Sequence, residues 1–107
     1  MDLSDKTVLV TAGASGIGWA ISQAFVSAGA RVHICDVSKD ALKSAENETP
    51  KISSTLADVS NLDHVDKVYE DIESLYGRLD VVVNNVGIAG PTAALEEIDP
   101  EDWTNTL

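Results

Sequence analysis

The chain alternates short apolar runs with segments whose apolar residues recur every three or four positions. Short apolar runs predict buried strands, and the three- and four-residue spacing predicts helices. The expected strands cover residues 7–11, 31–35, 52–57 and 79–83, and the expected helices cover residues 16–28, 38–46 and 61–76. Ile17 is expected on the apolar side of the first helix, and Leu62 and Leu75 on that of the third. A further helix is expected from Asp99, a good capping residue followed by a proline.

The order of these elements predicts an α/β fold with a doubly wound parallel sheet of the Rossmann type. Right-handed crossovers predict the order 3-2-1-4 for the first four strands. The fourth strand, with valines at 81–83, is then an apolar edge with nothing beyond it, and the helix after Asp99 stops before it shows a full apolar face. We therefore expect residues 1–107 to be a partial dinucleotide-binding domain, truncated within its fold.

Charge and composition narrow the classes of partner. The chain has 18 acidic and 7 basic residues and a formal net charge of −11, so neither a nucleic-acid nor a membrane partner is expected. No apolar run reaches the roughly 20 residues that span a bilayer, and no export signal is visible at the N-terminus. Cys35 lies in a strand-like run, and His33 and His64 show no metal-ligand spacing. We expect a cytoplasmic protein with a buried thiol and no metal site.

A glycine cluster joins the first strand to the first helix. Gly13, Gly16 and Gly18 follow the apolar run directly, and glycine lets the main chain turn sharply and approach a pyrophosphate. The free N–H groups and the positive dipole end of the following helix then hold the phosphates. A glycine motif by itself is also compatible with a simple tight turn. Its position at the first strand–helix junction favours a dinucleotide site.

Asp36 ends the second strand, at a position where a carboxylate can accept both hydroxyls of an adenosine ribose. Such a contact requires a cofactor without a 2′-phosphate. Neither Ser15 nor Val37 supplies a positive charge that would neutralise that phosphate, so the sequence favours NAD over NADP. The alternative is that Asp36 merely begins a turn.

Polar residues also follow the third and fourth strands. Asp58 can bond an adenine amino group while Val59 packs on the ring, and Gly87 lets the chain pass close to a ribose after Asn84 and Asn85. Taken singly, Asp58 is equally typical of a loop cap, and an Asn-Asn-x-Gly segment is more often an ordinary turn. Together with the glycine cluster and Asp36, they lie at the carboxyl ends of four successive strands, which is the edge where such sheets bind ligands.

These segments closely resemble the short-chain dehydrogenase/reductase family. Its patterns are T-G-x-x-x-G-x-G, an acidic residue after the second strand, D-V and N-N-A-G, and they match residues 11–18, 36, 58–59 and 84–87. Ala12 replaces the first glycine of the pattern, and Gly13 is expected to keep the turn open; Val86 replaces the usual alanine. The resemblance implies that Ser15 and Ile17 contact the phosphates and the nicotinamide side, Asp36 the adenosine ribose, Asp58 and Val59 the adenine, and Asn85 and Gly87 the neighbouring ribose.

The family's hydride transfer depends on a tyrosine four residues before a lysine, aided by a serine and an asparagine. Four residues after Tyr69 is Glu73, and four residues after Tyr76 is Asp80, so neither tyrosine fits and both are expected to be core residues. No catalytic residue is assigned. We expect this chain alone to lack the catalytic Ser, Tyr and Lys and to be inactive by itself.

The resemblance therefore implies the NAD-binding portion of an oxidoreductase. The complete protein would transfer a hydride between the nicotinamide and a small alcohol or carbonyl substrate, and family members are often homo-oligomers. An alternative is a short non-catalytic nucleotide-binding or regulatory module, which would bind NAD without turnover and pair its fourth strand with a partner. A third possibility is a degenerate fragment that binds nothing.

Overall fold

The computed structural model describes residues 2–85 and 97–98. The elements in chain order are β1 (Thr7–Thr11), α1 (Gly16–Ser27), β2 (Arg31–Asp36), α2 (Lys39–Glu48), β3 (Ser53–Leu56), α3 (Leu62–Tyr76), β4 (Val81–Val83) and β5 (Glu97–Ile98). Every strand and helix predicted up to residue 83 is present, with ends that differ by a few residues at most. The helix expected from Asp99 lies outside the described residues.

The strands form one sheet in the order β3-β2-β1-β4-β5. The first four strands are parallel to their neighbours, which confirms the predicted order 3-2-1-4. β5 runs antiparallel to β4 and pairs Ile98 with Val82 and Glu97 with Val83. The expectation of a fourth strand with nothing beyond it was wrong, because residues 97–98 return across that edge.

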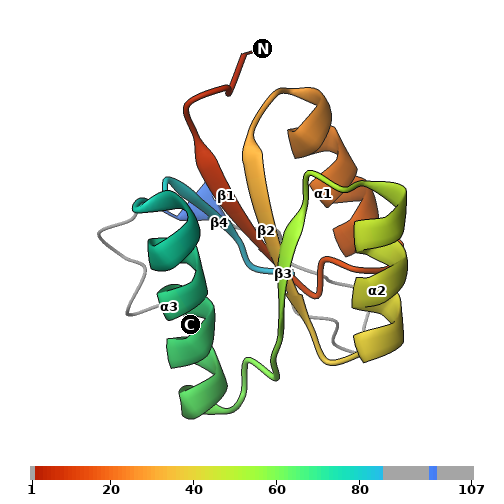
Figure 1. The fold of residues 1–107 in the computed structure, drawn as a ribbon, viewed down its shortest axis with the longest axis vertical. Coiled ribbons are helices and arrows are strands. Elements are labelled where there is room, and N and C mark those ends of the chain that lie inside the picture. The colour runs from red at the N-terminus through yellow and green to blue at the C-terminus, as the bar shows by residue number, and fades with distance from the viewer. Residues whose placement is uncertain (1, 86–96, 99–107) are drawn as a thin grey trace.

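Helices cover both faces of the sheet. Figure 1 shows α1 and α2 on one side and α3 on the other. Under α1 and α2 lies an apolar cluster of Val8, Val10, Ala14, Val32, Ile34, Leu42, Ala45, Ile52 and Val83, and under α3 a smaller one of Leu9, Cys35, Ala57, Val68, Ile72 and Val82. Alternate residues of β1 and β2 enter opposite clusters, so the central strands are buried on both faces, as their unbroken apolar runs predict.

The sequence placed three apolar residues incorrectly. Ile17, Leu62 and Leu75 are 60%, 74% and 56% exposed. Ile17 and Leu62 lie in the first turns of α1 and α3. The fully buried residues of α1 are the small Gly18 and Ser22, while Ile21 and Phe25 are partly buried against the cluster beneath, as predicted. Periodicity assigns a side of a helix, but it does not show how far the sheet beneath it extends.

The face under α3 also contains a buried polar network. Both ring nitrogens of His33 lie 2.7 Å from hydroxyls, Nδ1 from Ser53 and Nε2 from Thr55. The Thr55 hydroxyl donates in turn to Asp71 on α3 at 2.6 Å. Burial lowers the pKa of His33 to about 4, against weaker opposing effects of Asp71 and Glu46. His33 is therefore a neutral structural histidine at neutral pH.

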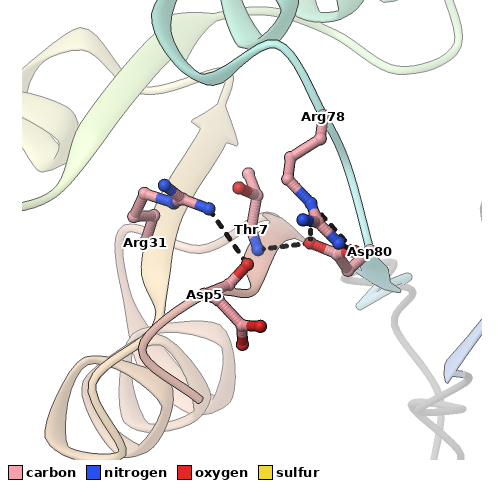
Figure 2. A network of polar contacts seen from close by, with 5 residues as sticks. All are labelled: Asp5, Thr7, Arg31, Arg78 and Asp80. Atoms are coloured by element: carbon pink, nitrogen blue, oxygen red, sulfur yellow. Dashed lines mark hydrogen bonds and ion pairs between the residues drawn. The ribbon is translucent and has the colours of Figure 1, made fainter.

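Charged side chains close the amino end of the sheet (Figure 2). The Asp80 carboxylate accepts the Thr7 N–H at 2.8 Å and pairs with the Arg78 guanidinium. Arg31 donates to the main-chain carbonyl of Asp5 at 3.0 Å. These contacts join the segment before β1 to β2 and β4. Among the described residues, no helix has the length and apolar character needed to cross a membrane.

Candidate functional site

The connection between β1 and α1 is a tight turn with two residues in the left-handed conformation. Ala12 has φ 50° and Gly16 has φ 59°. Gly13 does not have a positive φ, so its contribution to the turn is the space that its missing Cβ leaves and not its conformation. Ala12 itself adopts the strained φ, at a cost of about 1–2 kcal/mol relative to the right-handed region.

The three glycines of the turn have different surroundings. A Cβ at Gly18 would lie 1.9 Å from the Ala12 carbonyl oxygen, and a Cβ at Gly13 would lie 2.7 Å from Ile34 Cγ2. A Cβ at Gly16 would have no atom within 4 Å. Gly18 thus lets α1 pack directly on the turn, and Gly13 lets the turn pack on β2. Gly16 is required for its conformation and leaves open space outside the turn.

The N-terminus of α1 differs from those of α2 and α3. Ser38 Oγ caps α2 by accepting the Ala41 N–H at 3.1 Å, and Asn61 Oδ1 caps α3 by accepting the Asp63 and His64 N–H groups at 3.0 and 3.3 Å. Ser15 is the N-cap of α1 and makes no side-chain capping bond. The N–H groups of the first turn of α1 therefore lack a side-chain acceptor, and such an uncapped helix N-terminus is suited to bind an anion.

Asp36 holds the turn against the end of β2. Its carboxylate accepts the Ala14 N–H at 3.2 Å and the Ser38 N–H at 3.1 Å. The bond from the Ser38 N–H closes a turn that begins at Asp36, as the alternative interpretation of this residue predicted. A carboxylate has about four lone-pair directions, and two bonds leave capacity for the hydroxyls of a ligand. The group is fixed in place beside the glycine turn.

Asp58 lies at the end of β3 and organises its own loop. Its carboxylate accepts the Ser60 hydroxyl at 2.7 Å and the Ser60 N–H at 2.9 Å, and these bonds hold the pKa of Asp58 below its ordinary value. The Asp58 N–H donates to His64 Nδ1 at 2.9 Å. Val59 is half-buried beside it. Asp58 therefore does cap its loop, as the alternative interpretation predicted, and its carboxylate remains exposed to solvent.

Asn85 connects the end of β4 to the glycine turn. The side chain is buried, its main-chain N–H donates to Thr11 Oγ1 at 2.8 Å, and its Nδ2 donates to the Ala12 carbonyl at 3.4 Å. The bond to Ala12 supports the strained residue of the turn. Val86 and Gly87 lie outside the described residues.

A cleft of about 280 Å³ opens at the carboxyl ends of β1, β2, β3 and β4. Its lining contains four predicted site residues, Asp36, Asp58, Val59 and Asn85, together with Thr11, Ala12, Cys35, Val37 and Ala57. The latter five were not predicted as site residues. Their positions in the sequence could have indicated them, because each is one of the last two residues of a strand or directly follows a strand. The other described site residues are Gly13 and Ser15 in the turn that begins at Ala12, and Gly16, Ile17 and Gly18 in the first turn of α1.

Among the described residues, the cysteine thiol, the tyrosines and the possible metal ligands do not form a reactive centre in this cleft. Burial raises the pKa of the Cys35 thiol to about 12, as expected for a buried thiol. Tyr69 and Tyr76 pack against the cluster under α3, which confirms them as core residues, and burial and Asp66 raise the pKa of Tyr69. No group of three or more His, Cys, Asp or Glu residues in the described part of the chain could hold a metal ion.

Comparison with known proteins agrees with this geometry. The family model described as short chain dehydrogenase matches residues 6–107. The chain belongs to the short-chain dehydrogenase family. A short chain dehydrogenase/reductase of Gibberella zeae is 38% identical over 98% of this chain and 40% of its own length. A 3beta-hydroxysteroid dehydrogenase of Eggerthella lenta is 34% identical over 98% of this chain and 42% of its own length.

Solved structures show the same likeness. A crystal structure of a short chain dehydrogenase from Bacillus anthracis matches with a TM-score of 0.73 and 34% identity, covering 78% of this chain and 35% of that protein. The chain thus spans about 40% of the length of the curated relatives it matches. Family members are oxidoreductases that use nicotinamide cofactors, and this segment carries the Rossmann-type part of their fold.

Proposed function

We propose that this segment binds NAD across the carboxyl edge of its sheet. The observation that carries the proposal is the uncapped N-terminus of α1 beside the cleft. The diphosphate would lie over the glycine turn and accept main-chain N–H groups of the first turn of α1. The proposed contacts are Gly13, Ser15, Gly16, Ile17 and Gly18 with the phosphates and nicotinamide side, Asp36 with the adenosine ribose, Asp58 and Val59 with the adenine, and Asn85 and Gly87 with the second ribose.

Asp36 is the proposed basis of a preference for NAD over NADP. Two main-chain N–H groups hold its carboxylate at the end of β2, so it cannot easily move away from a 2′-phosphate. A fixed negative charge favours ribose hydroxyls as donors and repels a phosphate. The nearest cation downstream in sequence is Lys39, the first residue of α2, and it serves as a control for this proposal.

The whole protein is proposed to transfer a hydride between the nicotinamide and a small alcohol or carbonyl substrate. No tyrosine among residues 1–107 is followed four positions later by a lysine, so we propose that this segment alone does not catalyse the reaction. A cytoplasmic location and a homo-oligomeric state belong to the same proposal. The alternative, a non-catalytic module that pairs its fourth strand with a partner, is less favoured because β5 already pairs with β4.

Calorimetric titration of NAD and NADP into the protein tests this function. We expect saturable binding of NAD and a preference for NAD that Asp36→Asn reduces by at least about tenfold, since a charge-assisted bond contributes about 1.5–3 kcal/mol. Lys39→Gln should leave the preference for NAD intact. Absence of saturable binding of either dinucleotide would contradict the proposal, and an unchanged preference in Asp36→Asn would remove Asp36 from it.

A further inference from the structure

His64 lies in the first turn of α3, next to the loop that follows β3. Its Nδ1 accepts the Asp58 N–H at 2.9 Å. An imidazole nitrogen that accepts a hydrogen bond carries no proton, so the neutral ring bears its proton on Nε2. The bond fixes the main chain of Asp58 from one side, while the Ser60 hydroxyl and N–H hold the Asp58 carboxylate from the other.

His64 also lines a second cavity beside the cleft. This cavity has a volume of about 230 Å³ and is lined by Val37, Leu56, Ala57, Asp58 and His64. Val37, Ala57 and Asp58 line the cleft as well. These three residues form a wall that the cleft and the second cavity share, and His64 lines only the second cavity.

We propose that His64 is a positioning residue for the adenine end of the nucleotide site, acting through the main chain of Asp58. The inference rests on the proposed function, because it takes Asp58 and Val59 as adenine contacts. Without an acceptor at His64, the Asp58 N–H turns toward water and the loop loses the bond that sets the direction of Asp58 and Val59. His64 touches neither the cofactor nor the substrate in this arrangement.

Isothermal titration of NAD into the full protein tests the proposal. His64→Ala should bind NAD about fivefold more weakly than the wild type, the effect of losing one ordinary hydrogen bond. His64→Asn, whose Oδ1 takes the place of Nδ1 as the acceptor of the Asp58 N–H, should bind NAD like the wild type.

Asp63→Asn is the matched control, since it alters a charge in the same helical turn and leaves the bond to Asp58 in place. Nicotinamide mononucleotide, which lacks the adenine, should bind equally to the wild type and His64→Ala. The proposal is overturned if His64→Ala binds NAD as the wild type does, if His64→Asn binds as weakly as His64→Ala, or if nicotinamide mononucleotide loses as much affinity as NAD in His64→Ala. A wild-type protein that binds no NAD would overturn the proposed function itself, so the two failures are distinct.

Discussion

The two ends of the sheet use their polar groups differently. At the amino end, the Asp80 carboxylate binds both Arg78 and the Thr7 N–H, and Arg31 binds the Asp5 carbonyl (Figure 2). Within the described part of the chain, two atoms at this end, Thr7 Oγ1 and Arg31 Nε, are buried without a partner. At the carboxyl end, the first turn of α1 has no side-chain cap, and a cleft lies between the strand ends. The paired charges at the amino end stabilise the fold, whereas the uncapped N–H groups beside the cleft are the groups to which we propose that the ligand binds.

The largest effect should come from filling the space at Gly18. In Gly18→Ala, the new Cβ meets the Ala12 carbonyl oxygen at 1.9 Å, so α1 must move away from the turn. We expect the free energy of unfolding to fall by about 3 kcal/mol and NAD binding to be lost. Urea unfolding and calorimetric titration measure the two effects.

Gly16→Ala is the matched control for Gly18→Ala. Its Cβ meets no atom within 4 Å, and its only penalty is the positive φ of 59°. The free energy of unfolding should fall by about 1–2 kcal/mol. Equal losses in the two variants would contradict the prediction, because they would show that the close contact at position 18 costs no more than the positive φ at position 16.

The next largest effect should come from acidification, which acts on His33 in β2. An unfolded histidine takes up a proton near pH 6.5, whereas buried His33 has its pKa lowered to about 4. Between these values the unfolded state binds more protons, so the free energy of unfolding falls as the pH drops, by about 2–3 kcal/mol in total. Urea unfolding at a series of pH values measures this slope.

His33→Gln removes the titrating group and should remove the slope between about pH 6.5 and pH 4. Should that variant fail to fold, nuclear magnetic resonance of the wild-type imidazole gives the same information. A His33 ring that protonates near pH 6.5 in the folded protein would contradict the prediction.

Asp80→Ala tests the amino end. The substitution leaves the Thr7 N–H without its acceptor and Arg78 without its partner, and we expect a loss of about 2 kcal/mol in the free energy of unfolding. NAD affinity should not change, because the substitution is at the end of the sheet away from the cleft. Asp5→Ala is the control: it removes a charge at the same end but retains the carbonyl that Arg31 binds. A loss of NAD binding in Asp80→Ala would break the division between the two ends.

The loss of stability in Asp80→Ala should also depend on pH. Burial alone would raise the pKa of Asp80, but the bonds from Arg78 and the Thr7 N–H outweigh it and hold the pKa below the ordinary value. The stabilisation from Asp80 is therefore complete above the unfolded carboxyl pKa of about 3.9 and is lost as the pH falls through the lower folded value. The difference between wild type and Asp80→Ala should shrink in that acidic range.

The smallest predicted effect is a gain in stability. Ala12 adopts φ 50°, where glycine has no steric penalty. Ala12→Gly should raise the free energy of unfolding by about 0.5–1 kcal/mol, the relief of strain being partly offset by the greater freedom of glycine in the unfolded chain. Thermal unfolding at one pH detects it. A destabilised Ala12→Gly would mean that the alanine methyl makes contacts worth more than the strain.

The residues of the carboxyl end could be predicted from the sequence because topology leaves them little choice. Parallel strands joined by right-handed crossovers bring every carboxyl end to one edge, so Asp36, Asp58 and Asn85 had to gather there once the strands were recognised. Their hydrogen-bond partners could not be predicted, because the bonds from Ala14 to Asp36 and from Asp58 to His64 depend on the exact path of the loops.

Two further features could be seen only in the structure. The pairing of residues 97–98 with β4 could not be predicted, because no local sequence pattern indicates that the chain returns to that edge. The exposure of Ile17 and Leu62 could not be predicted either, because apolar spacing along a helix does not show which of its residues contact the sheet.

The sequence by itself determined the alternation of strands and helices, the strand order and the end of the sheet where small and polar residues collect. These follow from local periodicity and chain handedness, which act over a few residues or one crossover. Only the tertiary structure decided which polar groups are paired and which remain open to a ligand. Pairing requires two groups within about 3 Å of each other, and that distance is set by the packing of the whole sheet and its helices.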